Sequence, residues 1–425
     1  MASAQSETLL IHAGTLLSAP PAPPAKEQTI VITDGKIERI ENGYLSSVDT
    51  SARAGEIPRI IDLSDRFVLP GLFDGHVHLG FQSGGNPLLG FRQSDSEQAL
   101  TAMIFARRTL AAGFTTVRDL ASGPETMYAV RNAINTGRYM GPRILVSGPP
   151  ITARGGHGDY PGLRDDVWSN IELRQSGVCW DEGSCRDAVR GLIRRGSDVI
   201  KLMATGGFSS GTGPGQQLTY EEMKAAINAA HMRDVRVTTH AYDTSAIRDA
   251  VRAGVDSVEH GLGLDREVAR LMARQGTYFV PTLLGYQPLH IDPARLNQAV
   301  LAQSQSAFKT ARKAGVRIAF GTDAGGAIAH GKNGHEFERM VALGMTPMEA
   351  ITAATVTAAE MFGMLAESGT LEPGKRADVI AVSGNPLDDV IALTTVEFVM
   401  IGGKVAKQSG VMRPGEDWAD PFAHP

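Results

Sequence analysis

Cysteine is scarce in this chain of 425 residues, which contains only Cys179 and Cys185. Two cysteines are too few for the disulfide framework of a small secreted scaffold. They lie six residues apart and can close a small loop in an oxidising compartment. Two unpaired thiols are the interpretation we favour, and the sequence leaves the pairing open.

The chain also lacks an excess of charge of one sign and a long apolar run. Lys and Arg number 41 against 46 Asp and Glu, which gives a net charge of −5. Without a basic cluster or a long like-charge run, we expect no nucleic-acid partner and no interaction tail. No apolar stretch of the sequence is long enough to span a bilayer, so we expect no membrane partner. Hydrophobic residues still make up 42%, enough for a large buried core.

The N-terminal residues carry a processing signal. Ala2-Ser3-Ala4 before Gln5 is typical of the end of a cleaved signal peptide, with Met1 added for expression. We therefore hypothesise that the native precursor is exported, to the periplasm or the medium, with a cytoplasmic location as the alternative. The gene sequence upstream of this point tests the hypothesis, and a native start at Met1 would refute it.

Helix-like segments that end at a glycine, each followed by a β-branched run, recur through the middle of the chain. This is the expected junction between a helix and a buried parallel strand. With three runs that lack the glycine, the pattern predicts eight strands: 67–74, 114–119, 143–147, 197–201, 235–240, 255–260, 277–281 and 316–323. Eight βα units predict an α/β fold, the (β/α)8 TIM barrel. A doubly wound sheet is the alternative, but two histidines replace the glycine-rich turn that it requires.

Both ends of the chain resemble short strands joined by turns. The Pro-rich segment 19–25 and the Gly402-Gly403 turn separate such strands. Neither end has enough apolar residues for an independent core. We therefore expect one small composite β-sandwich domain from residues 1–66 and 370–425, beside a barrel domain at 67–369.

Histidines gather at the ends of the predicted strands, where barrel active sites lie. His76 and His78 are two residues apart, so an extended strand directs both imidazoles to one face. His240 and His260 end two later strands. Imidazoles that converge in this way are typical metal ligands.

Two charged residues complete this set. Lys201 lies in an otherwise apolar strand, where a bare ammonium is costly to bury. It is either ion-paired or carbamylated by CO₂, which would make it a carboxylate able to bridge two metals. Asp323 ends the last strand, where a carboxylate can bind a metal and take a proton from water.

In their order along the chain, these residues resemble the amidohydrolase superfamily with a two-metal site. The motifs are His76-Val-His78, Lys201, His240, His260 and Asp323. The resemblance implies two Zn²⁺ ions: one on His76, His78 and Asp323, the other on His240 and His260, with carbamylated Lys201 as the bridge.

Further motifs resemble one branch of the superfamily, the imidazolonepropionase-like and Xaa-Pro dipeptidase-like carboxypeptidases. They are 199–207, Thr152–Gly158, His240-Ala-Tyr242 and His330-Gly-Lys-Asn333. Bacterial amidohydrolases that split ochratoxin A into ochratoxin α and phenylalanine are the most similar group. The resemblance also implies a homo-oligomer, often an octamer.

The implied reaction is hydrolysis of the amide bond of an N-acyl amino acid or dipeptide. A hydroxide that bridges the metals attacks the carbonyl, and Asp323 acts as general base and then general acid. His157 is the expected donor to the oxyanion, although a solvated loop histidine is an alternative. Arg154, Tyr242 and His330 are candidate substrate contacts; a loop salt bridge and a packing role are the alternatives for the first two.

Two other functions remain open on the same fold. A mononuclear deaminase or cyclic amide or amidine hydrolase would want a glutamate soon after His240, where Ala-Tyr-Asp-Thr stands instead. A non-catalytic binding or assembly protein usually loses ligands, whereas all six positions are present here. The physiological substrate depends on the barrel loops and is not fixed by these motifs.

Overall fold

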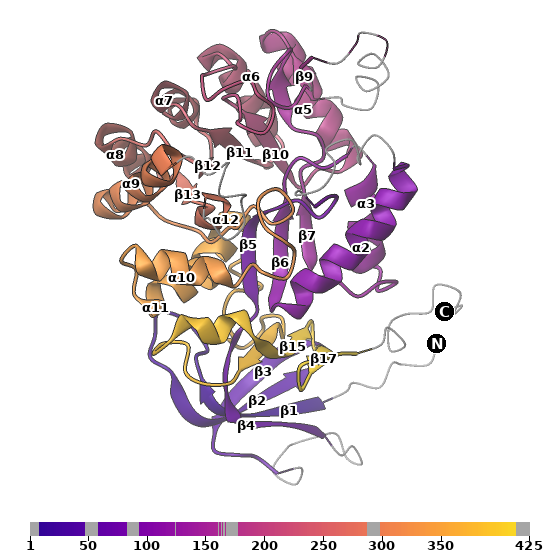
Figure 1. Cartoon of the computed structure of the whole chain (residues 1–425). Coiled ribbons are helices and arrows are strands. Elements are labelled where there is room, and N and C mark those ends of the chain that lie inside the picture. Colours follow the sequence, from indigo (N-terminus) through magenta and orange to yellow (C-terminus); the bar gives the residue numbers. More distant parts are fainter. Residues whose placement is uncertain are drawn as a thin grey trace.

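The computed structural model describes residues 8–413 except 47–57, 83–92, 124, 160, 163, 165, 167–176 and 287–297. Figure 1 shows strands surrounded by helices at one end of the molecule and a β-sheet at the other end. The predicted processing signal at residues 2–5 lies outside the described residues. Within them, no helix is both long and apolar enough to cross a bilayer.

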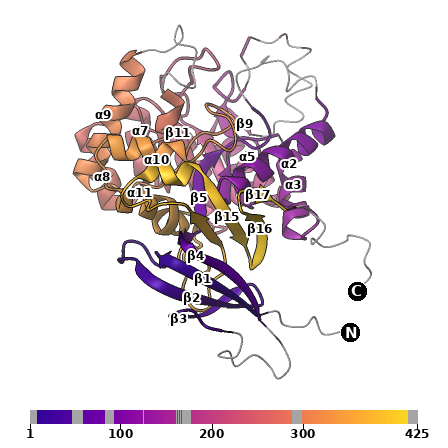
Figure 2. The ribbon, with the colours of Figure 1, turned by 60° about the horizontal axis from the view of Figure 1, so that its bottom comes forward.

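The β-sheet is built from both ends of the chain, as the sequence predicts. Its eight strands follow the order β17-β16-β15-β14-β4-β1-β2-β3. β4 runs parallel to β1 on one side and antiparallel to β14 on the other, so strands from the N-terminal and C-terminal parts of the chain lie side by side (Figure 2). The strands are β1 (Thr8–Leu16), β2 (Ala25–Thr33), β3 (Lys36–Asn42), β4 (Arg59–Pro70), β14 (Val379–Val382), β15 (Val396–Ile401), β16 (Lys404–Gln408) and β17 (Val411–Met412).

Side chains of this terminal sheet alternate between two cores, as the period of a strand requires. On β14, Val379 and Ala381 enter a core that is internal to the sheet. Ile380 and Val382 point the other way, into the large core of the barrel. The sheet therefore shares a buried face with the barrel.

Parallel strands form the barrel in the chain order that the sequence predicts. They fall into the sets β5-β6-β7 and β13-β12-β11-β10-β8-β9. A backbone hydrogen bond from Asp198 N to Val146 O, 2.8 Å long, joins β10 to β7. Seven of these are the predicted barrel strands: β5 (Leu72–Val77), β6 (Phe114–Asp119), β7 (Arg143–Val146), β10 (Val199–Met203), β11 (Arg236–Ala241), β12 (Ser257–His260) and β13 (Tyr278–Val280). Two short strands that the sequence did not predict, β8 (Ile151–Ala153) and β9 (Val178–Cys179), continue the second set beyond β10.

Two predicted strands differ in the structure. The run 67–74 is divided, because residues up to Pro70 belong to β4 and the barrel strand β5 begins at Leu72. The run 316–323 is not a regular strand, although it occupies the eighth position. Phe279 N donates to Arg317 O (2.9 Å) and Asp323 N donates to His76 O (2.8 Å), so this segment bridges β13 and β5 and closes the barrel.

Helices follow most barrel strands and cover the outside of the barrel (Figure 1). Three of the glycines in the predicted glycine-then-strand junctions, Gly196, Gly254 and Gly276, cap their helices in the left-handed conformation. The helices are α2 (Asp95–Ala111), α3 (Thr126–Asn135), α5 (Glu182–Arg195), α6 (Tyr220–His231), α7 (Thr244–Ala253), α8 (Arg266–Gln275), α9 (Gln298–Ala314), α10 (His335–Ala342), α11 (Pro347–Thr352) and α12 (Ala358–Phe362). Shorter turns are η1 (Leu283–Tyr286), the π-helical η2 (Ala353–Thr357) and η3 (Val390–Thr394).

Cys179 and Cys185 form a disulfide, so the preference for unpaired thiols is wrong. Asp181 caps α5 by accepting a hydrogen bond from Ser184 N, and this turn folds the helix start back onto β9. The two Cα atoms are consequently 4.9 Å apart. The sequence shows the spacing but not this turn, which is why the pairing could not be decided from it.

Candidate metal centre

His76, His78 and Asp323 lie together at the ends of β5 and of the eighth barrel segment. One ligand atom of each lies within 4.8 Å of the others. His78 Nε2 is 3.0 Å from Asp323 Oδ1, and His76 Nε2 is 3.8 Å from it. The spacing of two residues thus brings both imidazoles to one place, as predicted. Donor groups of this kind and separation suit a divalent transition metal.

His240 and His260 extend this group. The ring of His260 lies 5.0 Å from that of His76 and 4.8 Å from that of His240, measured between centroids. Each comes from the end of its strand, β11 or β12. Both His260 and Asp323 have left-handed backbones, with φ of 68° and 61°, as is common where strained residues form a functional site.

Lys201 is enclosed in the same region. It lies on β10 with 1% of its surface exposed, and its Nζ has no hydrogen-bond partner among the described residues. Burial lowers the pKa of this amine to about 8, while the charges of Glu259 and Asp323 act in the opposite direction. A buried amine without a partner is costly, so the surroundings of Lys201 suit a further polar or charged group.

Three of the imidazoles have one ring nitrogen fixed by a protein oxygen. His76 Nδ1 donates to Glu259 Oε2 (2.8 Å), and His240 Nε2 donates to the Gly206 carbonyl (3.1 Å). His260 Nδ1 is 2.7 Å from Thr282 Oγ1. The second nitrogen of each ring remains for a metal, which is the usual arrangement of metal-binding histidines.

The protonation of these rings also fits a metal. Burial holds the pKa of His76, His240 and His260 well below the ordinary value for histidine. Neutral imidazole is the form that binds metals. Together with the partnerless amine of Lys201, this donor set fits a divalent metal site.

Glu259 orients His76, a role that the sequence pattern did not indicate. Its Oε1 accepts from Arg118 Nη2 (2.7 Å) and Ser257 Oγ (3.0 Å). Thr238 Oγ1 donates to the same oxygen. All these side chains are buried in the barrel. The sequence signal was a carboxylate and an arginine within strands predicted to be buried, but their pairing is not visible in the sequence.

Asp74 is a second missed residue, with a different task. Its Oδ1 accepts from the backbone of His76 (3.0 Å) and Thr322 (3.1 Å), and Asn333 Nδ2 donates to its Oδ2 (2.7 Å). Burial raises the pKa of Asp74 to about 6. Through these hydrogen bonds, Asp74 ties β5 to the segment that carries Asp323.

His157 and Tyr242, two predicted site residues, lie against the histidine group. The His157 ring is 4.7 Å from that of His240, and the Tyr242 ring is 4.4 Å from it on centroids. Burial lowers the pKa of His157 to about 4. Tyr286 donates to the Tyr242 hydroxyl at 3.4 Å. Both positions adjoin the candidate ligands.

Arg154 and His330, the other predicted contacts, have different surroundings. The Arg154 guanidinium lies over the ring of Trp180, 4.5 Å from its centroid. The His330 ring stacks on Phe105, and its Nε2 donates to the Phe81 carbonyl (3.0 Å). These contacts give His330 a packing role, and its contact with substrate stays a prediction.

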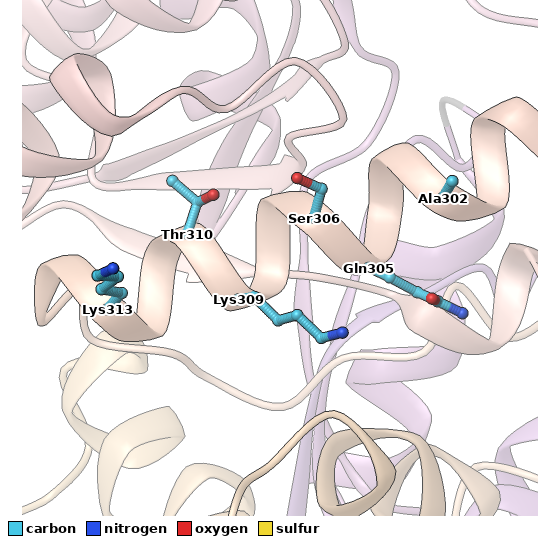
Figure 3. A pocket seen from close by; sticks show the side chains of 6 residues that line it. All are labelled: Ala302, Gln305, Ser306, Lys309, Thr310 and Lys313. Atoms are coloured by element: carbon cyan, nitrogen blue, oxygen red, sulfur yellow. The ribbon is translucent and has the colours of Figure 1, made fainter.

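A shallow surface hollow lies along one face of α9 (Figure 3). Its lining comes from that single helix and shares no residue with the metal centre: Ala302, Gln305, Ser306, Lys309, Thr310 and Lys313. The hollow lacks the donor groups that the chemistry needs, so we assign it no part in the site.

Comparisons with known proteins agree with this geometry. The sequence model of the family described as "Amidohydrolase family" matches residues 67–406. Ochratoxinase from Aspergillus niger is 32% identical over 461 aligned residues, which cover 98% of this chain and 90% of that protein. Its crystal structure superposes with a TM-score of 0.85 at 30% identity, over 98% of this chain and 99% of that one.

A second solved structure is equally similar in fold. A Xaa-Pro dipeptidase with methionine bound in its active site superposes with a TM-score of 0.85 at 34% identity, over 94% of this chain and 100% of that one. The family match covers most of the chain, and the six predicted ligands gather where barrel enzymes place their active sites. This chain therefore belongs to the amidohydrolase family.

Proposed function

We propose that this metal-dependent amidohydrolase cleaves the amide bond of N-acyl amino acids or dipeptides, as a carboxypeptidase does. Ochratoxin A, giving ochratoxin α and L-phenylalanine, is the first substrate to test. The observation that carries the proposal is the group of neutral imidazoles beside the buried amine of Lys201, which no described residue satisfies. Relatives named ochratoxinase and Xaa-Pro dipeptidase support both kinds of substrate.

The proposed ligands divide between two divalent cations, most simply Zn²⁺. His76, His78 and Asp323 would hold one, and His240 and His260 the other. Lys201 would bridge them as a carbamate. Its depressed pKa of about 8 supports this, because the neutral amine is the form that adds to CO₂. The addition forms an N–C bond, releases one proton and leaves a carboxylate-like group in the place of the ammonium.

The chain's own residues would handle the protons of the reaction. When bound, the cations would polarise the amide carbonyl and lower the pKa of an attacking water. Asp323 would take the proton of that water and deliver it to the leaving amine. The His157 imidazole would donate a hydrogen bond to the oxygen that becomes negative in the transition state.

An exposed aromatic side chain near the centre supports an aromatic substrate. Phe208 stacks on Tyr242 with ring centroids 5.0 Å apart, and 49% of its surface is exposed. Trp180, 56% exposed, lies beneath Arg154. An exposed ring beside a catalytic centre offers a surface for stacking. Arg154 and Tyr242 are the groups that we propose for the α-carboxylate of the substrate.

A hydrolysis screen tests the proposed function. It covers N-acyl amino acids, dipeptides and ochratoxin A, with and without a chelator, and release of the free amino acid is measured. We expect hydrolysis that the chelator abolishes and that Asp323→Asn lowers by at least about 100-fold. Asp187→Asn, on a side chain 79% exposed, is the matched control. Activity that survives the chelator would refute the proposal.

We also propose a homo-oligomer, on the strength of the resemblance to the family. Light scattering on the purified protein tests it, with a mass several times the 45.2 kDa of one chain as the expected result. A mass equal to that of one chain would refute it.

A further inference from the structure

Thr282 contacts one of the proposed metal ligands and has a strained backbone. Its Oγ1 lies 2.7 Å from His260 Nδ1, and both side chains are buried. Its φ is 48°, in the left-handed region that a β-branched residue rarely adopts. Such a conformation is costly and persists only where the surrounding structure imposes it. The contact behind His260 therefore depends on whatever restrains the backbone of Thr282.

The carboxyl group of Glu336 restrains the chain directly after Thr282. Leu283 N donates to Oε1 and Leu284 N donates to Oε2, both at 2.8 Å. The first of these N–H groups belongs to the peptide bond between Thr282 and Leu283, so its direction depends on the backbone angles of Thr282. Strand β13 fixes the chain just before Thr282. The residue is thus held on both sides, by a strand and by a fully buried carboxyl group.

The start of α10, which carries Glu336, is itself anchored to the barrel. Asn333 O accepts from Glu336 N (3.1 Å), and Asn333 Nδ2 donates to Asp74 Oδ2 (2.7 Å). Asp74 lies on β5, two residues before His76. Glu336 is therefore tied to the strand of one proposed ligand while it holds the segment behind another.

We infer that Glu336 is a positioning residue for His260, because its carboxyl group holds Thr282 in the conformation that keeps the hydroxyl on the imidazole. Without the two N–H bonds, the peptide after Thr282 can turn and release the strain. The hydroxyl then leaves Nδ1, and the ring loses a contact that fixes its orientation. The hold on Thr282 follows from the contacts, whereas its consequence for a metal ion rests on the proposed function.

Crystal structures of the unaltered protein and of Glu336→Gln test the hold on Thr282, whatever metal the purified protein contains. The amide offers one oxygen where two N–H groups need an acceptor, so one of them loses its partner. We expect Thr282 to leave the left-handed region and its hydroxyl to move away from His260 Nδ1. Glu267→Gln, at an exposed position of α8, is the control and should keep both features. An unchanged Thr282 in Glu336→Gln would overturn the inference.

Zinc retention after dialysis against graded chelator supplies a second reading, through a double-mutant cycle. Thr282→Val keeps the branched shape of the side chain and removes the hydroxyl. We expect Glu336→Gln and Thr282→Val each to weaken one of the two zinc ions about 10-fold. The double variant should lose no more than either single variant, because both changes remove the same contact. Thr282→Ser keeps the hydroxyl and should retain zinc as the unaltered protein does.

Losses that multiply to about 100-fold in the double variant would show that Glu336 acts by another route, and would overturn the inference. A merely structural role would weaken both zinc ions alike, which would also contradict it. Failure of the proposed function is distinguishable from these outcomes. Fewer than two zinc ions on the unaltered protein, or no amide hydrolysis, would contradict that function, while the crystal structures would still report whether Glu336 holds Thr282.

Discussion

Glu259 is the residue on which the orientation of His76 most directly depends. It is fully buried, accepts from His76 Nδ1 at 2.8 Å and pairs with Arg118 at 2.7 Å. A carboxylate behind a ligating histidine raises the basicity of the ring and fixes its tautomer. Glu259 is therefore a supporting residue of the proposed metal site, although it would bind no metal itself.

Glu259→Gln should weaken zinc binding by about 10- to 100-fold. It should also lower the free energy of unfolding by about 3 kcal/mol, because Arg118 would keep a buried charge without its partner. Zinc retained after dialysis against graded chelator measures the first effect, and urea unfolding measures the second. Glu360→Gln, at an exposed pair 3.7 Å from Arg317, is the control. Zinc retention equal to that of the unaltered protein would contradict this role.

The residues of the site were predictable to different degrees. His76, His78, His240, His260 and Asp323 each stand at the end of a predicted strand, so their meeting follows from the barrel. Glu259 and His76 are 183 residues apart, and their hydrogen bond depends on side-chain geometry inside the barrel. No pattern in the sequence reports that geometry.

Among the elements, the segment from β10 to α6 depends most on a single glycine. Gly207 lies against the His157 ring, where a Cβ would meet Cε1 at 2.2 Å. Gly207→Ala should therefore displace the ring and lower kcat/KM by at least about 10-fold, as small misplacements of catalytic groups do. Gly215→Ala is the matched control, since a Cβ there meets nothing within 4 Å. Equal kinetics for the two variants would show that the ring position is unimportant.

The contact between α10 and η1 predicts a dependence of stability on pH. Glu336 of α10 accepts from the backbone N–H groups of Leu283 and Leu284, both at 2.8 Å. Burial raises the pKa of this carboxyl from 4.5 to about 8. Between these values the folded protein holds a proton that the unfolded chain has released. This residue therefore makes the free energy of unfolding fall as pH rises through that window, by up to about 1.4 kcal/mol per pH unit.

Glu336→Gln removes this titration and should flatten the dependence between pH 4.5 and 8. Urea unfolding at several pH values measures the slope for the variant and the unaltered protein. Glu267→Gln, at an exposed position of α8, serves as the control. A slope unchanged in Glu336→Gln would mean that the carboxyl titrates normally in the folded state.

Elements were predictable where local pattern decides them. The glycine-then-strand junctions located the central strands, because glycine at a helix end and a β-branched run are both local signals. The division of 67–74 was not predictable, since Phe67 to Pro70 join β4 through pairing with β14, more than 300 residues later. The eighth barrel segment, 316–323, was likewise not predictable as it stands, because backbone hydrogen bonds to Phe279 and His76 hold it in place.

At the scale of the whole molecule, the terminal sheet and the barrel are joined by a buried ion pair. Arg143 Nη1 at the start of β7 lies 3.0 Å from Asp378 Oδ2, and Asp378 Oδ1 accepts from Gly402 N (2.8 Å). The composite sheet was foreseeable, because neither chain end could form a core alone. Its strand order, with β4 between β1 and β14, was not foreseeable, because it depends on long-range pairing.

Asp378→Ala should lower the free energy of unfolding by about 3 kcal/mol, because it leaves the partly buried Arg143 without its partner. The number of zinc ions bound per chain should not change, since the metal centre lies at the other end of the barrel strands. Urea unfolding and metal analysis on the same samples measure the two effects. Asp187→Ala is the exposed control. Loss of zinc in Asp378→Ala would mean that the sheet also shapes the site.

We propose that the six gathered residues bind two metal ions and that hydrolysis depends on both. This proposal is tested most directly by amide hydrolysis measured against the equivalents of Zn²⁺ added to chelator-stripped protein, with the fastest substrate of the screen. We expect no activity without zinc and a rise to a plateau at two equivalents per chain. A plateau at one equivalent, or stripped protein as active as untreated protein, would contradict it.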